Sequence, residues 1–266
     1  MLQRHNGCHV TDILGLGTVA VWLSPIVVAP FIGSFMGVLI VRLPEEQPIV
    51  VARSVCPHCE TRLAPSDLIP LLSFVLLRGR CRYCHQPIEW LHPLVELAAV
   101  AVAVWAAIAG TGNIWIDCAL GWTLLTLAWI DWRCLLLPDV LTLPLLLGGL
   151  VVTLLSAPSA LTDHCLAAML AYGFFQGLAW GYRRVRGRDG LGGGDAKLLA
   201  AAGAWCGLAP LPFVVLGSAI LGLLAALGLA IATRAVTSRT PIPFGPCIAL
   251  AFWLAWLHPG LANGGW

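Results

Sequence analysis

Long apolar blocks recur along almost the whole chain, and each approaches the length that a helix needs to cross a bilayer. About 20 apolar residues span the hydrocarbon core, and fewer suffice where neighbouring helices shield the segment. With 59% hydrophobic and 11% charged residues and a mean hydropathy of +0.87, a water-soluble fold is excluded. The sequence predicts an all-α, polytopic membrane helix bundle of about eight transmembrane helices, over residues 18–41, 93–109, 114–130, 140–155, 165–181, 196–208, 211–233 and 244–261.

The basic residues orient these helices. With eight spans and an outside N-terminus, the inside loops and the inner end of the sixth span hold every Lys and Arg except Arg4. This is the distribution expected when positively charged loops stay in the cytoplasm. We therefore expect an outside N-terminus with the first helix (1–41), a small cytoplasmic domain (42–92) and a transmembrane bundle (93–266). A net charge of +2, spread over the loops, argues against nucleic-acid binding.

Two C-x-x-C pairs lie in the predicted cytoplasmic domain, Cys56 with Cys59 and Cys81 with Cys84. Two such turns brought together supply the tetrahedral thiolate cage that Zn²⁺ prefers. A domain of this size has too little core of its own, so a metal crosslink would stabilise it. We predict a structural zinc site. The alternatives are a redox pair, pairs without metal, or disulfides, which a cytoplasmic location disfavours.

Three acidic residues lie at the predicted cytoplasmic boundary of the membrane: Asp131, Asp139 and Asp195. Carboxylates beside apolar spans are costly, which makes them functional candidates. Asp139 and Asp195 open helices and are alternatively N-caps. Asp131 ends a helix, where the helix dipole disfavours an anion, so this residue has no obvious structural role.

Two facing carboxylates at this depth suit peptide hydrolysis. Two carboxyl groups at short range share one proton, because two negative charges so close repel each other. The ionised group takes a proton from water while the protonated group polarises a carbonyl. The glycines before Asp195, Gly194 among them, would let the backbone approach a substrate strand. Lys197 would favour a nearby ionised carboxylate or bind lipid phosphate, or it is an ordinary lysine of the inner boundary.

Several ordered motifs between about residues 31 and 249 resemble the type IV prepilin peptidases, membrane aspartic proteases of the G-x-G-D type. One departure is Gly37, where the family usually carries Asn. The resemblance implies that Asp131 and Asp195 are the catalytic pair, with Asp139, Lys197 and Gly194 as supporting candidates, and that Gly79 and Glu96 fall in regions linked to methylation. The matching stretches are Phe31-Ile32-Gly33-Ser34-Phe35, Arg42-Leu43-Pro44, Asp67-Leu68-Ile69-Pro70, Leu77-Arg78-Gly79-Arg80-Cys81, Pro93-Leu94-Val95-Glu96, Leu137-Pro138-Asp139, Gly192-Gly193-Gly194-Asp195-Ala196-Lys197 and Pro243-Phe244-Gly245-Pro246.

The resemblance further implies the reaction and its partners. The expected enzyme cleaves the leader of type IV prepilins or type II secretion pseudopilins at the cytoplasmic face of the bacterial inner membrane. It then N-methylates the new terminus with S-adenosylmethionine. Two other hypotheses differ in class: a proton-coupled transporter with a cytoplasmic zinc domain, which predicts acids near the midplane and repeated halves, and a non-catalytic assembly subunit, which leaves Asp131 unexplained.

Overall fold

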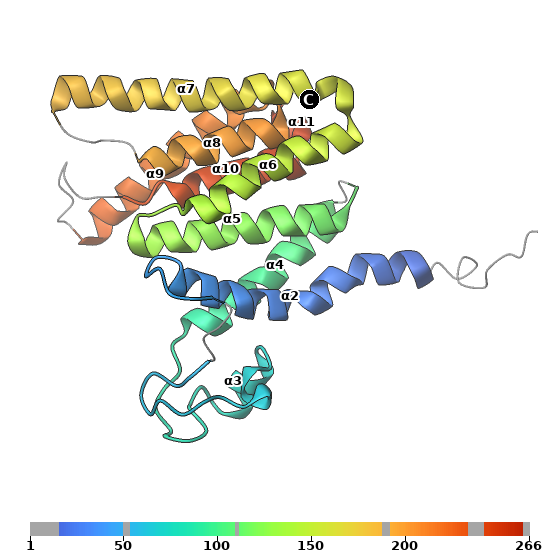
Figure 1. Cartoon of the computed structure of the whole chain (residues 1–266), viewed down its shortest axis with the longest axis vertical. Coiled ribbons are helices and arrows are strands. Elements are labelled where there is room, and N and C mark those ends of the chain that lie inside the picture. The colour runs from blue at the N-terminus through green and yellow to red at the C-terminus, as the bar shows by residue number, and fades with distance from the viewer. Residues whose placement is uncertain (1–15, 50–53, 110–111, 188–191, 234–241, 263–266) are drawn as a thin grey trace, which may run out of the picture. The chain divides into compact units, whose positions relative to one another are not determined.

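The computed structural model describes residues 16–49, 54–109, 112–187, 192–233 and 242–262. In these ranges the chain is helical, and the only strand-like pairing is two isolated β-bridges, Val55 with Arg62 and Arg80 with Pro87. A helix lies over each predicted apolar segment, which confirms the all-α bundle (Figure 1). These helices are α2 (Leu16–Arg42), α4 (Leu91–Ala109), α5 (Ile114–Cys134), α6 (Asp139–Ser156), α7 (Leu161–Arg186), α8 (Gly193–Cys206), α9 (Leu211–Thr233) and α10 (Gly245–Leu257).

Five of these helices are long and apolar enough to cross a membrane on their own: α2 from Val21 onward, α4, α5, α6 and α9. The chain is therefore a multi-pass membrane protein. Helix α8 has 14 residues and α10 has 13. At 1.5 Å per residue, α8 is about 21 Å long, against a hydrocarbon core of about 30 Å. Such short helices persist in a membrane only when other helices cover them.

The described residues form two compact units. The first comprises residues 16–37, 54–109 and 112–119, and the second comprises 38–49, 120–187, 192–233 and 242–262. In the first unit, α2 and α4 lie very close together. A Cβ placed on Gly33 of α2 would stand 2.5 Å from the Cα of Glu96 and 3.1 Å from the Cβ of Ala99. Glycine and alanine at this crossing therefore let the two helix backbones approach, as is common in membrane bundles. The loops between these helices carry a 3-10 turn (Pro65–Leu68) and the short helix α3 (Leu72–Leu76).

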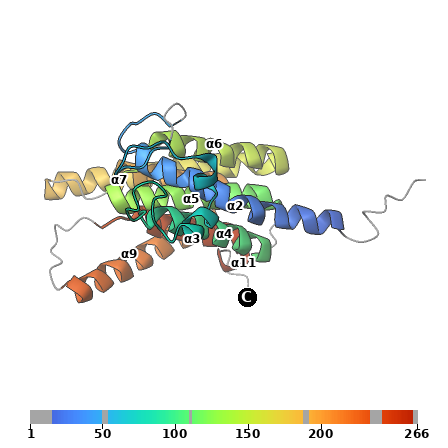
Figure 2. The ribbon, with the colours of Figure 1, turned by 90° about the horizontal axis from the view of Figure 1, so that it is seen from below.

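Helix α8 forms the centre of the second unit, packed against α6, α7, α9 and α10 (Figure 1). Ten of its 14 residues are buried, most of them Ala, Leu or Gly. Gly203 lies against the backbone of Ala167, and the ring of Trp205 lies over Gly149 while its indole N–H donates to Leu145 O at 2.7 Å. Helix α9, by contrast, diverges from α7 toward its C-terminal end, and its residues up to Ala232 are largely exposed there (Figure 2).

Candidate active site and metal centre

Asp131 lies in the last turn of α5 and is buried. Its Oδ2 accepts a 2.7 Å hydrogen bond from the backbone N–H of Gly245, the first residue of α10. The first N–H groups of a helix have no partner within the helix, and its N-terminus carries partial positive charge. The carboxylate that is misplaced on its own helix is therefore held by the N-terminus of another.

Gly245 has no room for a side chain. A Cβ at this position would stand 2.7 Å from Oδ2 and 2.9 Å from Cγ of Asp131. Pro246 follows in the first turn of α10, where the missing N–H of proline costs no helical hydrogen bond. The sequence motif around Gly245 is recognisable, but the motif alone gave this glycine no role. A Gly-Pro pair opening an apolar run is the signal for the helix N-terminus found here.

Asp195 is the third residue of α8 and is also buried. The N-cap of α8 is Gly192, whose carbonyl accepts the N–H of Asp195 at 3.1 Å, so the alternative N-cap interpretation of Asp195 is wrong. The charge of Asp131 acts on Asp195, and both charges act on the buried Cys247 near the start of α10. The structure thus places the two carboxyl groups of the predicted catalytic pair close enough for their charges to interact.

The glycines before Asp195 differ in their surroundings. A Cβ on Gly194 would stand 2.7 Å from the Cβ of the buried Leu137, in the loop between α5 and α6. A Cβ on Gly192 would lie 3.1 Å from Oδ2 of Asp195, whereas a Cβ on Gly193 would meet nothing within 4 Å. Gly194 is therefore needed for packing, and Gly193 is the glycine that leaves open space beside the candidate site.

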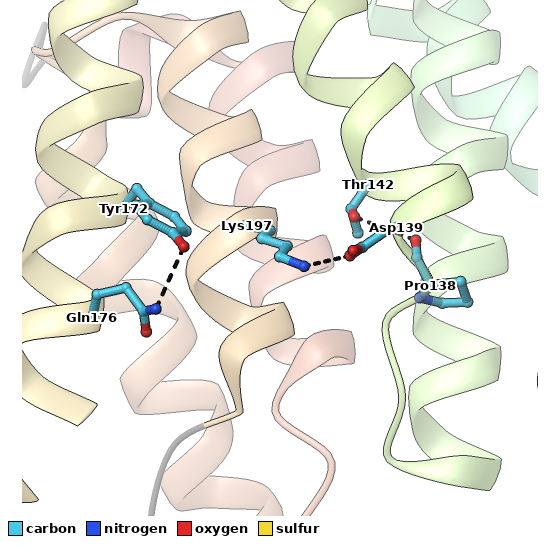
Figure 3. Close-up of polar contacts among 6 residues, drawn as sticks. All are labelled: Pro138, Asp139, Thr142, Tyr172, Gln176 and Lys197. Atoms are coloured by element: carbon cyan, nitrogen blue, oxygen red, sulfur yellow. Dashed lines mark hydrogen bonds and ion pairs between the residues drawn. The ribbon is translucent and has the colours of Figure 1, made fainter. Parts of the chain in front are cut away.

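Asp139 is the first residue of α6, and its N-cap is Pro138 without a side-chain cap bond. The interpretation of Asp139 as an N-cap is therefore wrong. Its carboxylate instead forms a 2.5 Å ion pair with Nζ of Lys197, which reaches across from α8 (Figure 3). The Asp139 side chain is 57% exposed. The pair ties the start of α6 to α8, two residues after Asp195 in the chain.

The four cysteines of the two C-x-x-C pairs converge, with ligand atoms all within 4.8 Å of one another. Both pairs adopt one backbone pattern. The N–H of Cys56 donates to Thr61 O and the N–H of Glu60 to Cys56 O. Likewise, the N–H of Cys81 donates to Gln86 O and that of His85 to Cys81 O. Glu60 and His85 both have positive φ, at 56° and 59°. We call these loops the two knuckles, 56–61 and 81–86.

The thiol set fits a soft divalent cation. Hydrogen bonds from Thr61 lower the pKa of Cys59 to about 7, whereas burial and the three neighbouring thiols raise the pKa of Cys84 to about 12 despite the backbone N–H of Gln86. Four thiols this close do not all ionise unaided, because each thiolate disfavours the next. A bound cation removes that repulsion and deprotonates its ligands, and four sulfur donors in a closed shell are the preference of Zn²⁺.

Glu96 and Gly79 each have a structural role in the first unit. The buried Glu96 accepts the backbone N–H of Leu71 at 2.7 Å, and Leu71 has a φ of 58°. Gly79 has a φ of 68°, and a Cβ there would meet the ring of Phe74 at 3.0 Å.

Gly37 of α2 lies where a Cβ would approach Nδ1 of His92 at 2.8 Å. The histidine ring thus fills the space that a larger residue at position 37 would take. Glycine at this place in the motif therefore leaves room for the ring of His92.

Comparison with known proteins identifies the family of the chain. Residues 27–109 match the bacterial peptidase A24 N-terminal domain and residues 118–227 match the type IV leader peptidase family. No solved structure matches.

Three similar proteins are each named prepilin leader peptidase/N-methyltransferase. The Aeromonas hydrophila protein is 41% identical over 85% of this chain and 87% of its own length. The Pseudomonas aeruginosa protein is 35% identical over 92% and 93% of the two chains, and the Burkholderia pseudomallei protein is 42% identical over 78% and 67%. The chain belongs to the type IV leader peptidase family, a family of aspartic peptidases.

Proposed function

We propose that this chain cleaves the leader from type IV prepilins or type II secretion pseudopilins and N-methylates the new terminus with S-adenosylmethionine. Membership of the family and the names of its relatives support both activities. The observation that carries the peptidase is the interaction of the buried Asp131 and Asp195 carboxyl groups, contributed by α5 and α8. No finding supports the transporter alternative.

The proposed mechanism gives the two acids different protonation states. A backbone N–H donates to each carboxyl group, from Gly245 to Asp131 and from Gly192 to Asp195. In the proposed cycle Asp131 carries the charge and Asp195 holds the shared proton. Asp131 then removes a proton from a water molecule while the water oxygen attacks the scissile carbonyl carbon. The proton of Asp195 polarises the carbonyl oxygen. The C–N bond breaks as the proton taken from water passes to the leaving amine, so both carboxyl groups return to their starting states.

The location of the reaction follows from the basic loops. We assign the N-terminus to the outside of the bacterial inner membrane, and residues 42–92 and the aspartate pair to its cytoplasmic face. We assign a separate role to each of three segments. Residues 1–41 form the N-terminus and first helix, 42–92 the zinc-binding domain, and 93–266 the bundle that carries the aspartate pair. A prepilin with a basic leader and an apolar helix presents its cleavage point at this boundary of the membrane.

Zn²⁺ held by Cys56, Cys59, Cys81 and Cys84 would join the two knuckles, and S-adenosylmethionine would supply the methyl group. The contacts of Glu96 with Leu71, and of Gly79 with Phe74, support a role for both residues in holding the loop region rather than in touching the methyl donor.

A peptide assay tests the proposal. A prepilin-like peptide with a basic leader and an apolar segment is incubated with the purified full chain in lipid, with and without S-adenosylmethionine, and its mass is measured. We expect cleavage in both samples and the mass of one added methyl group only with the donor. Asp131→Asn and Asp195→Asn should each abolish cleavage, whereas the matched variant Asp139→Asn should retain it. Cleavage by either of the first two variants would remove that residue from the pair.

A further inference from the structure

A patch of apolar side chains between the two knuckles is exposed. It runs from the end of the 3-10 turn through α3, with Val75 at 69% and Leu76 at 71% exposure. Monomeric domains rarely leave neighbouring large apolar residues in water, and such patches mark interaction sites. We call this set the α3 patch: Leu68, Ile69, Leu72, Val75 and Leu76.

Two contacts, made by residues that alternate with those of the patch along the chain, tie α3 to the beginning of α4. The N–H of Leu71, directly before α3, donates to the buried Oε2 of Glu96 at 2.7 Å. The ring of Phe74, within α3, packs edge-on against Trp90 with centroids 5.2 Å apart. Trp90 is the residue before α4, and Glu96 is the sixth residue of that helix. Glu96 therefore lies about 7.5 Å along the helix axis from its start.

These contacts fix the level of α3 with respect to a bilayer. Helix α4 is long and apolar enough to cross a membrane over Leu91–Ala109. Trp90 is 68% exposed at the end of that span, the position at which tryptophan typically marks the membrane interface. Since α3 is held between the levels of Trp90 and Glu96, the α3 patch lies where the span enters the lipid.

Charge favours lipid over a protein partner as the occupant. Arg78 and Arg80 directly follow α3 and are exposed, and Arg82 pairs with Asp67 at 2.9 Å. Apolar side chains flanked by arginine are typical of segments that lie in the interface of an anionic membrane. Each basic residue near such a surface contributes about 1 kcal/mol of attraction.

We propose that the α3 patch is embedded in the headgroup region of an anionic leaflet, beside the start of α4, with Arg78 and Arg80 on the lipid phosphates. The loop region is then a membrane-seated part of the chain rather than a domain suspended in water. This inference concerns the first unit alone and does not depend on the proposed catalytic function.

A depth measurement tests it in the full chain. A keto amino acid placed at Leu76 and coupled to a nitroxide avoids the ten native cysteines. Collision rates of the nitroxide with oxygen and with a water-soluble nickel chelate are measured in phosphatidylglycerol nanodiscs. The exposed Glu60, in the first knuckle, serves as the aqueous control, and Val104, within α4, serves as the lipid control.

We expect the label at position 76 to collide with oxygen in preference to nickel, as at position 104, and the label at position 60 to show the reverse. Nickel access at position 76 equal to that at position 60 overturns the proposal. Protection from both reagents overturns it too, because protein rather than lipid would then cover the patch.

The lipid charge is tested with the same label at position 76. Replacing phosphatidylglycerol by phosphatidylcholine, or introducing Arg78→Gln with Arg80→Gln, should shift its collision ratio toward the aqueous value. Leader-peptide cleavage measured in the same samples reports separately on the enzyme. A ratio that neither change shifts overturns the assignment of the two arginines to lipid phosphate.

Discussion

Gly245 and Asp131 are so close that one carbon atom added to the glycine would stand 2.7 Å from the carboxylate oxygen that its N–H binds. The two residues are 114 positions apart in the chain, yet the start of α10 forms the support of the Asp131 carboxylate. The geometry of the carboxylate pair therefore depends on three helices, α5, α8 and α10.

Gly245→Ala should inactivate the peptidase without unfolding the bundle. The methyl group displaces Asp131, and a shift of about 1 Å at a reacting group lowers a rate by about 100-fold. Leader cleavage by the purified variant measures this loss. The matched control is Gly228→Ala in α9, where a Cβ meets nothing within 4 Å. Equal rates for the two variants would contradict the supporting role of Gly245.

Gly193→Ala and Gly194→Ala should separate packing from substrate approach. The Cβ at position 194 collides with Leu137, so this variant should lose thermal stability, by about 1–3 kcal/mol as for other overpacked sites. The Cβ at position 193 has open space, so that variant should keep its stability. If the substrate backbone passes beside residue 193, the KM of the Gly193→Ala variant for the leader peptide rises. Thermal unfolding and steady-state kinetics on both variants distinguish the two effects, and a less stable Gly193→Ala variant would contradict the assignment.

The ion pair of Asp139 and Lys197 should contribute little to stability and leave the chemistry intact. Its side chains are 57% and 31% exposed, and exposed pairs contribute about 0–1 kcal/mol. Asp139→Asn, Lys197→Met and the double variant form a cycle whose coupling energy is measured by unfolding. We expect all three to cleave a leader peptide far faster than Asp195→Asn. Abolished cleavage in Asp139→Asn would instead place that residue in the catalytic machinery.

Removing any one of the four clustered thiols should release zinc. Cys56→Ser is expected to lower the bound zinc, measured by elemental analysis, whereas His58→Ala and His85→Ala should retain it because the cluster consists of thiols alone. Acid should have the same effect as thiol removal. The pKa of Cys59 is about 7, so its thiolate is present above that pH and becomes protonated below it, and metal affinity falls as pH falls. Zinc retained equally at pH 5 and pH 8 would contradict thiolate ligation.

Glu96→Gln and Glu96→Leu should differ. Glutamine keeps an oxygen that accepts the N–H of Leu71, whereas leucine removes the acceptor of a 2.7 Å hydrogen bond. A buried N–H left without a partner costs about 1–3 kcal/mol. We expect Glu96→Leu to impair methylation more than cleavage, with Glu96→Gln near the parent for both, in the peptide mass assay. Equal loss in both variants would assign a role to the charge itself.

Local patterns predicted much of this protein. Apolar length placed the eight helices, and the position of Asp131 at a helix C-terminus, where the dipole disfavours an anion, singled it out as a residue without an obvious structural role. The pairing of Asp131 with Gly245 and of Asp139 with Lys197 depends on how distant helices pack, which no local pattern encodes. The two N-cap interpretations failed for a related reason. Pro138 and Gly192 occupy the N-cap positions of α6 and α8, which leaves both aspartates inside the first turn.

Burial of α8 on nearly all sides has a consequence for how the protein tolerates different membranes. A helix that faces lipid shifts or tilts when the hydrocarbon thickness changes. Helix α8, shorter than the bilayer core and enclosed by its neighbours, takes its depth from protein packing instead. The outer helices can therefore absorb a mismatch with thinner or thicker lipid while Asp195 keeps its level, so the position of a cut along a membrane-inserted substrate would not vary with lipid composition.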